Sequence, residues 1–234
     1  MEGFEYKDIF ATKAVEYLVI LAFLVLLVLY FRLLNKQAKG AKSDRPPEEM
    51  RVPLIDFFKV AAGYYYHLGH AWIKPEKNES VWVGMDDFAR KLLGKIDELV
   101  LPEPGAPLMQ GESGWKIKIA GKGLDILSPV NGQVEDVNQI LRDHPEKLSP
   151  DDFTTSWLLK VKVPKLESAM NNLLSGNMAT AWLNETVKQL QRDMPDTLRE
   201  NISEEDIKNK GLARLMDKNN WVSIAEKFFK PVRH

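Results

Sequence analysis

The sequence predicts a mainly β protein, a β sandwich with small helices, with one N-terminal transmembrane helix before it and a helical C-terminal tail after it. Short runs rich in Val, Ile and Trp alternate with turn signals between residues 64 and 163, as strands of a sandwich do. A long apolar run precedes them, and helical spacing follows them. We therefore divide the chain into an anchor (1–36), a linker with a short amphipathic segment (37–63), a β domain (64–165) and a helical extension (166–234).

The bulk composition excludes several classes of function. A chain of 234 residues has room for one medium domain with appendages. Its formal net charge of −1 gives no global attraction to nucleic acid, so no nucleic-acid partner is expected. The chain has no cysteine, which removes disulfides, thiolate metal sites and cysteine nucleophiles together.

The apolar run predicts a membrane anchor. Residues 17–31 carry no charge, glycine or proline, and residues 14–34 give about 20 residues, enough to span a hydrocarbon core as a helix. The slightly acidic start and the lack of a small-x-small cleavage site after the run favour an uncleaved anchor over a signal peptide. Basic residues follow the run directly, so the C-terminal domain is predicted to be cytoplasmic and the N-terminus outside, in a single-pass protein of the cell (inner) membrane. These basic residues are Arg32, Lys36, Lys39, Lys42 and Arg45.

Alternation and turn residues place the expected strands. We expect them at residues 65–73, 80–84, 96–101, 115–120, 124–127, 132–138 and 157–163. One helix, at residues 85–93, interrupts the series. The tail is predicted to contain helices at residues 166–174, 177–194, 212–216 and 221–229, with Pro195 ending the second of them and Ser203 capping a further one.

Several segments in a fixed order resemble a known family. They are Gly69-His70-Ala71-Trp72-Ile73, Val81 to Gly94, Leu99 to Gly111, Ser128 to Val134 and Trp157 to Lys162. Together they resemble the H protein of the glycine cleavage system over roughly residues 64–165. The resemblance implies a lipoyl-domain-like fold (a barrel-sandwich hybrid) and, in the family, a lipoyl group on a lysine at the tip of a hairpin.

The position of that lysine decides the predicted function. In the family it lies seven positions before the Ser of the Ser-Pro-Val element, and here that position is Gly121. Lys122 follows, at the predicted tip of a Gly121-Lys122-Gly123 turn, while Lys118 stands where the family has a glutamate. Two interpretations stay open: Lys122 carries lipoate, or it is an unmodified lysine in a solvated turn.

Other constellations have structural explanations. His67 and His70 fall on opposite faces of a predicted strand, which is poor geometry for a shared metal, so His70 is interpreted as a packed framework residue. Asp86 and Asp87 lie at the start of a predicted helix, where capping explains them. The chain shows no nucleophile–base arrangement, P-loop or dinucleotide fingerprint, so we predict no catalytic and no metal-binding residues.

The sequence thus predicts a non-catalytic accessory or scaffold subunit of a membrane complex, without a cofactor. The alternative is a membrane-tethered carrier with lipoate on Lys122. A third class, a lone membrane-anchored module that binds lipid or peptide, has no specific feature in its favour.

Overall fold

The computed structural model describes residues 17–30, 57–148 and 153–230. It divides into two units, Met1–Arg51 and Val52–His234, which are described separately. In the first unit the described part is a helix at residues 17–30, and its large apolar side chains are all exposed. Within the described ranges, no helix combines the length and the apolarity that crossing a membrane requires. The predicted span at residues 14–34 extends on both sides beyond what the structure describes.

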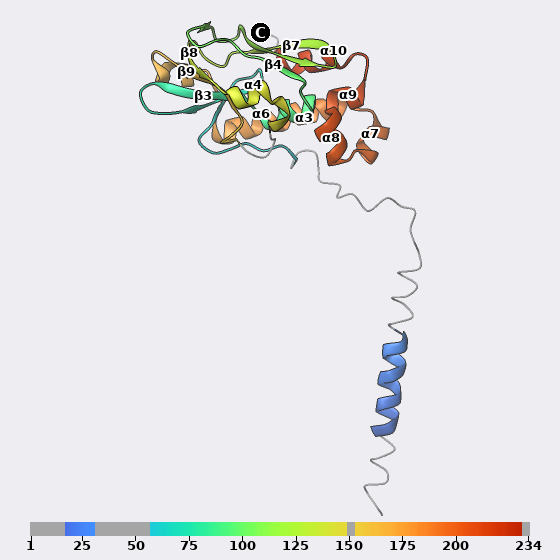
Figure 1. Cartoon of the computed structure of the whole chain (residues 1–234). Helices are drawn as coiled ribbons and strands as arrows, with labels where there is room; N and C mark the ends of the chain where they lie inside the picture. Colours follow the sequence, from blue (N-terminus) through green and yellow to red (C-terminus); the bar gives the residue numbers. More distant parts are fainter. Residues whose placement is uncertain (1–16, 31–56, 149–152, 231–234) are drawn as a thin grey trace, which may run out of the picture. The chain divides into compact units, whose positions relative to one another are not determined.

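Two antiparallel sheets form the β part of the second unit (Figure 1). The larger sheet has the order β1-β2-β3-β9-β8-β5 and the smaller one β4-β6-β7. The strands of the larger sheet are β1 (Tyr65–Tyr66), β2 (Ala71–Pro75), β3 (Ser80–Met85), β5 (Pro107–Leu108), β8 (Gly132–Val137) and β9 (Trp157–Lys162). Those of the smaller sheet are β4 (Glu98–Val100), β6 (Ser113–Ile119) and β7 (Lys122–Leu127).

Alternation along the strands builds the core between the sheets. In β6, Trp115, Ile117 and Ile119 are buried, whereas Lys116 and Lys118 point away from the core. The prediction of a mainly β fold with small helices is therefore confirmed for the described residues, and the alternating face of β6 is the one expected from the sequence.

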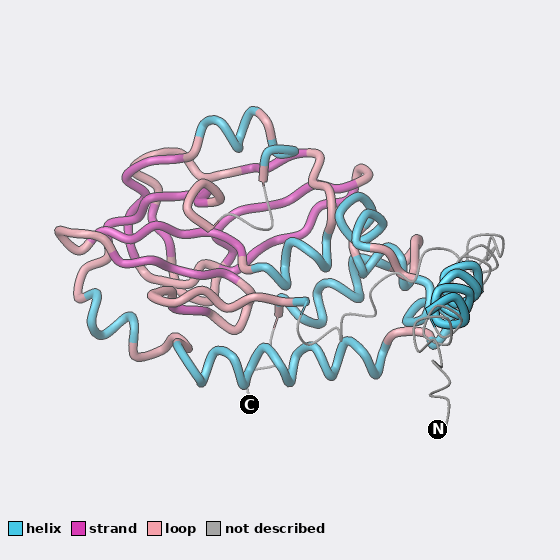
Figure 2. Tube along the Cα trace, turned by 90° about the horizontal axis from the view of Figure 1, so that it is seen from below, coloured by secondary structure: helices cyan, strands magenta, loops and turns pink. Residues whose placement is uncertain are grey.

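Within the second unit, the described helices lie mostly on one side of the strands, and the longest of them, α6 (Gly176–Asp193), runs along that side (Figure 2). Around the sheets lie α3 (Asp87–Leu93), α4 (Gln139–Asp143) and the 3-10 helix η1 (Pro145–Lys147). The tail contains α5 (Leu166–Met170), α6, α7 (Asp196–Asn201), α8 (Glu204–Lys210), α9 (Leu212–Met216) and α10 (Trp221–Phe229).

The tail packs on the β domain rather than standing apart from it. Helices α8 and α9 contact α3, and α10 contacts β7, beside which it lies in Figure 1. At the joint between α3 and α9 the backbones approach so closely that a Cβ on Gly211 would lie 2.2 Å from the carbonyl carbon of Leu93. Buried tail residues such as Leu190 and Phe229 belong to the same apolar cluster as the strands. The two predicted segments therefore share one core.

Several predicted elements need correction. The strand expected at residues 65–73 is two strands, because a turn that contains His70, with φ +61°, separates β1 from β2. The short elements β5, α4 and α7 were not predicted, since two to six residues give too little periodicity to identify a helix or strand. The amphipathic segment expected at residues 54–61 lies partly outside the described residues.

We expect Gly211→Ala to loosen the joint between the tail and α3. The new methyl group would meet the backbone of Leu93, and such overpacking costs about 1–3 kcal/mol. The matched control is Gly63→Ala, because Gly63 also has a positive φ (+80° against +75°) but no atom within 4 Å of an added Cβ. The measurement is urea unfolding of the full chain in detergent. Equal losses of stability in the two variants would show that the close contact does not matter.

Candidate functional site

The hairpin between β6 and β7 is where the sequence placed the candidate lysine. Ile119 pairs with Lys122, so the two-residue tip is Ala120–Gly121, with φ of +50° and +75°. The predicted tip at Gly121-Lys122-Gly123 is wrong: Lys122 is the first residue of β7. The register has a physical cause, since a slip of one residue would turn Leu124 and Ile126 out of the core.

Lys122 is exposed, but its side chain is engaged by the tail. Its Nζ donates a hydrogen bond of 2.6 Å to the backbone oxygen of Asn219, in the turn between α9 and α10. Gly121, which the resemblance places at the family's attachment position, lies at the exposed tip, and a Cβ added there would meet nothing within 4 Å. The position thus has room for a side chain but carries no amine.

A glutamate from another strand lies beside Lys118, which stands where the family has a glutamate of its own. Lys118 pairs across the sheet with Glu98 of β4, and its Nζ lies 2.9 Å from the Oε1 of that glutamate. Both side chains are about half exposed, so this ion pair contributes at most about 1 kcal/mol of stability. Sequence reasoning missed it because the partner lies 20 residues away along the chain.

His70 connects the β domain to the tail. Its Nδ1 lies 2.7 Å from an oxygen of Asp86, and its ring stacks on Phe88 of α3 with centroids 4.4 Å apart. The rings of Trp182 of α6 and Phe229 of α10 lie 4.7 and 5.8 Å from it. The interpretation of His70 as a packed, hydrogen-bonded residue agrees with this environment. His67, whose Nδ1 accepts from the backbone of Gly69, has a separate local role.

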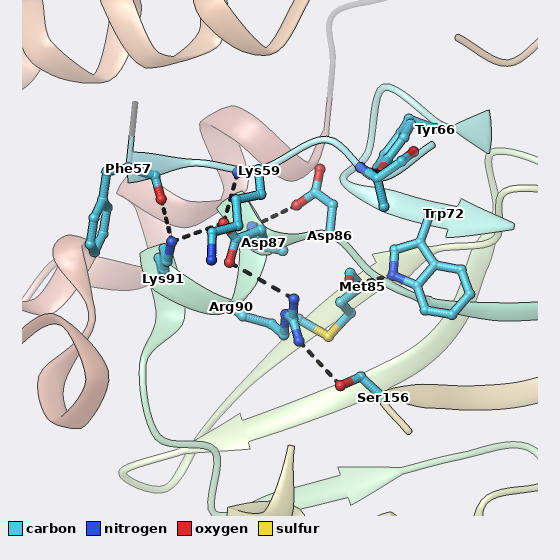
Figure 3. A network of polar contacts seen from close by, with 12 residues as sticks. Phe57, Lys59, Tyr66, Trp72, Met85, Asp86, Asp87, Arg90, Lys91 and Ser156 are labelled. Carbon is cyan, nitrogen blue, oxygen red and sulfur yellow. Dashed lines mark hydrogen bonds and ion pairs between the residues drawn. The ribbon is translucent and has the colours of Figure 1, made fainter. Parts of the chain in front are cut away.

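A buried polar network surrounds the start of α3 (Figure 3). Asp86 caps the helix by accepting from the backbone N–H of Ala89, as predicted. The prediction that Asp87 is explained by capping is wrong, because Asp87 is the first residue of α3 rather than its cap. It is fully buried, accepts from the backbone N–H of Lys59, and pairs with Lys91 at 2.9 Å. Lys91 also donates to the backbone oxygen of Phe57. The two charges therefore fasten the segment that leads into the domain onto α3.

Burial dominates the electrostatics of Asp87. It raises the pKa of the carboxyl above 3.8, although the nearby Lys91 and Arg90 oppose the shift. Desolvation of this carboxylate thus outweighs its attraction to the two cations. The i,i+4 spacing of Asp87 and Lys91 indicates that the two can pair on a helix, but nothing in the local sequence pattern indicates that the pair is buried.

Comparison with known proteins gives the family. The family model described as "Glycine cleavage H-protein" matches residues 64–186, more than half of the chain. The chain belongs to the glycine cleavage H-protein family. The match extends into α6, whereas the resemblance in the sequence ends near residue 165.

Two relatives agree with this assignment in sequence. A probable glycine cleavage system H protein of Pyrococcus abyssi is 32% identical over 126 residues, which cover 54% of this chain and 93% of the relative. A glycine cleavage system H protein of Mycobacterium avium is 35% identical over 124 residues, covering 52% of this chain and 94% of the relative. A crystal structure of such a protein from Mycobacterium marinum is 26% identical and covers 54% of this chain and 98% of its own, with a TM-score of 0.46.

We expect Asp87→Ala to destabilise the protein by about 3–5 kcal/mol, because it leaves the charge of Lys91 buried without its carboxylate. The control is Asp125→Ala, which removes an exposed partner of Lys116 and costs at most about 1 kcal/mol. Denaturant unfolding at neutral pH compares the two. Similar losses would contradict a special role for the buried pair.

The same carboxyl predicts a pH dependence. Because folding raises the pKa of Asp87, the folded protein binds the proton of this carboxyl more tightly than the unfolded chain does. The stability that this proton contributes is fully present below pH 3.8 and is lost as the pH rises through the raised pKa. Unfolding measured across the acid range should therefore show this loss in the wild type and not in Asp87→Asn.

Proposed function

We propose that this protein is a non-catalytic, membrane-anchored accessory subunit of a membrane protein complex, built on an H-protein domain that has lost its lipoyl arm. The family is that of lipoyl carriers, which are themselves not catalysts. The two functions considered below differ in whether this chain carries a lipoyl group.

Gly121 is the observation that carries the proposal. The hairpin, its register and its exposed tip are present, but the attachment position has no amine. The neighbouring lysine is not an equivalent substitute, because Lys122 is a strand residue and its ammonium is hydrogen-bonded to Asn219. A modifying enzyme would have to break this bond and accept a lysine displaced by one residue.

The tail supports a structural role. Residues beyond 186, outside the match to the family, include α8, α9 and α10, which pack on α3 and on the lipoyl-type hairpin. They bury large side chains, among them Trp221 and Phe228. Such an addition enlarges the domain and leaves the hairpin fixed on one side, which suits a scaffold better than a mobile carrier.

The membrane anchor rests on the helix at residues 17–30. Its large apolar side chains are between 37% and 66% exposed, and no charged residue occurs in it. An exposed apolar surface of this kind favours burial in lipid or against another apolar helix. With the basic cluster that follows, this supports an anchor with the β domain on the cytoplasmic side.

The alternative function is a membrane-tethered lipoyl carrier. It is favoured by the exposure of Lys122 beside the tip, and by the names of the relatives, which are glycine cleavage system H proteins. In this function Lys122 would hold the arm, and the partners would be other proteins of glycine cleavage.

Intact mass of the native protein separates the two functions. We expect the unmodified mass, because no amine occupies the family's position. A lipoyl adduct that maps to Lys122 and disappears in Lys122→Arg would contradict the proposal and establish the carrier.

A matched variant with a lysine at position 121 provides the positive control for lipoate attachment. Gly121→Lys places an amine at the family's position, where the space around an added Cβ is open but the φ of +75° strains a residue with a side chain. Native protein and variant are incubated with a lipoate-attaching enzyme and lipoate, and an adduct on the variant alone is expected. An equal adduct on both proteins would show that Lys122 is itself a substrate.

Membrane extraction tests the anchor. We expect the full chain to stay with membranes at alkaline pH, because insertion of about a dozen Leu, Val, Ile and Phe side chains at residues 17–31 into lipid would outweigh the charges at the ends. A variant with Leu21→Lys and Val25→Lys should be released. Digestion of the β domain by external protease in intact cells would overturn the orientation.

A further inference from the structure

A partly exposed aromatic hollow lies on the outer face of the larger sheet. Strand alternation puts Val81 and Val83 into the core, and so turns Trp82 outward. Trp157 of β9 lies beside it, with ring centroids 4.5 Å apart. Around these two tryptophans is a hollow of about 210 Å³. Its described lining also contains Tyr64, Trp72, Lys74, Phe153 and Thr154.

Packing keeps this hollow open. A Cβ on Gly84 would lie 2.3 Å from the ring of Trp72, so the missing side chain lets that ring pack directly against β3. Trp72 and Tyr64 are then buried under α6 and Phe153, whereas Trp82 and Trp157 stay partly exposed. Tryptophan and tyrosine in such positions are the residues that most often dominate binding energy at protein interfaces.

Two lysines lie over aromatic rings of the hollow, and within the part of the chain that the structure describes, acidic residues act on only one of them, Lys160. Lys74 lies over the ring of Tyr64, 5.3 Å from its centroid, and Lys160 lies over Trp82 at 4.9 Å. Lys160 is already paired with Glu76, at 2.9 Å. Among the described residues, Lys74 forms no ion pair, and no acidic side chain lines the hollow. A carboxylate of a binding partner could therefore form an ion pair with Lys74, next to the apolar hollow.

The size of the hollow suits a small group. Small-molecule sites usually measure about 300–1,000 Å³, so a hollow of 210 Å³ suits a single apolar side chain or proline ring. Aromatic-lined grooves of this kind bind extended proline-containing segments.

We propose that this hollow docks an extended, acidic, proline-containing segment of a partner subunit. One proline or apolar side chain fills the space between Trp82 and Trp157, and an adjacent carboxylate pairs with Lys74. The inference rests on the proposed accessory function and names the surface that the partner uses.

A defined probe tests the proposal. An acetylated peptide of alternating glutamate and proline is titrated into the full chain in detergent and followed by calorimetry, with a lysine–proline peptide of equal length as its counterpart. We expect binding of the acidic peptide alone, about tenfold weaker in Lys74→Glu because attraction becomes repulsion. Lys77→Glu is the matched control: it makes the same change of charge at an exposed lysine outside the hollow, and should weaken binding less.

Other outcomes overturn the proposal. Binding of both peptides alike, binding unaffected by Lys74→Glu, or no binding at millimolar peptide would each do so. Binding to phosphatidylserine vesicles that is lost in Trp82→Ala, without peptide binding, would assign the surface to lipid instead. Unfolding measurements on each variant show that the fold is retained. The outcome is independent of the mass of the native protein, so failure here leaves the proposed function to its own test.

Discussion

The contact of His70 with three helices is the constraint on which the arrangement of this protein depends. His70 belongs to the turn between β1 and β2, yet its ring meets Phe88, Trp182 and Phe229 from α3, α6 and α10. Its hydrogen bond to Asp86 fixes the ring against the cap of α3. Because one buried side chain touches all of these elements, the tail and the β domain cannot shift independently without disturbing it.

The contacts of His70 explain why the tail covers one side of the hairpin between β6 and β7. With Phe229 held near His70, α10 lies along β7, and the turn before α10 brings Asn219 to Lys122. The tip at Gly121 stays exposed, so the fold keeps the form of a carrier hairpin. What it lacks is the amine at the tip, a difference of chemistry rather than of shape. The proposed accessory role follows from that difference.

Most of the β domain could be predicted from the sequence, because its information is local. Alternation at Trp115, Ile117 and Ile119 identified the buried face of β6, and Asp86 was recognised as a helix cap. Elements of two to six residues, such as β5 and α7, carried too few residues to show a period. The hairpin tip was predicted at Gly121-Lys122-Gly123, because glycines flank the lysine on both sides. It lies at Ala120–Gly121 instead, because the pairing that keeps Leu124 and Ile126 in the core makes Lys122 a strand residue.

By itself, the sequence determined the family, the positions of most strands along the chain and the identity of residue 121, because motif order and residue identity do not depend on contacts. Only the tertiary structure decided that the tail shares the core of the domain, that Asn219 engages Lys122, and that Asp87 and Lys91 form a buried pair. Each of these joins residues through burial or through distant parts of the chain, where no local pattern specifies the partner. The tip of the hairpin between β6 and β7 depends on both. The sequence determines which side chains it carries, and packing of the core determines its register.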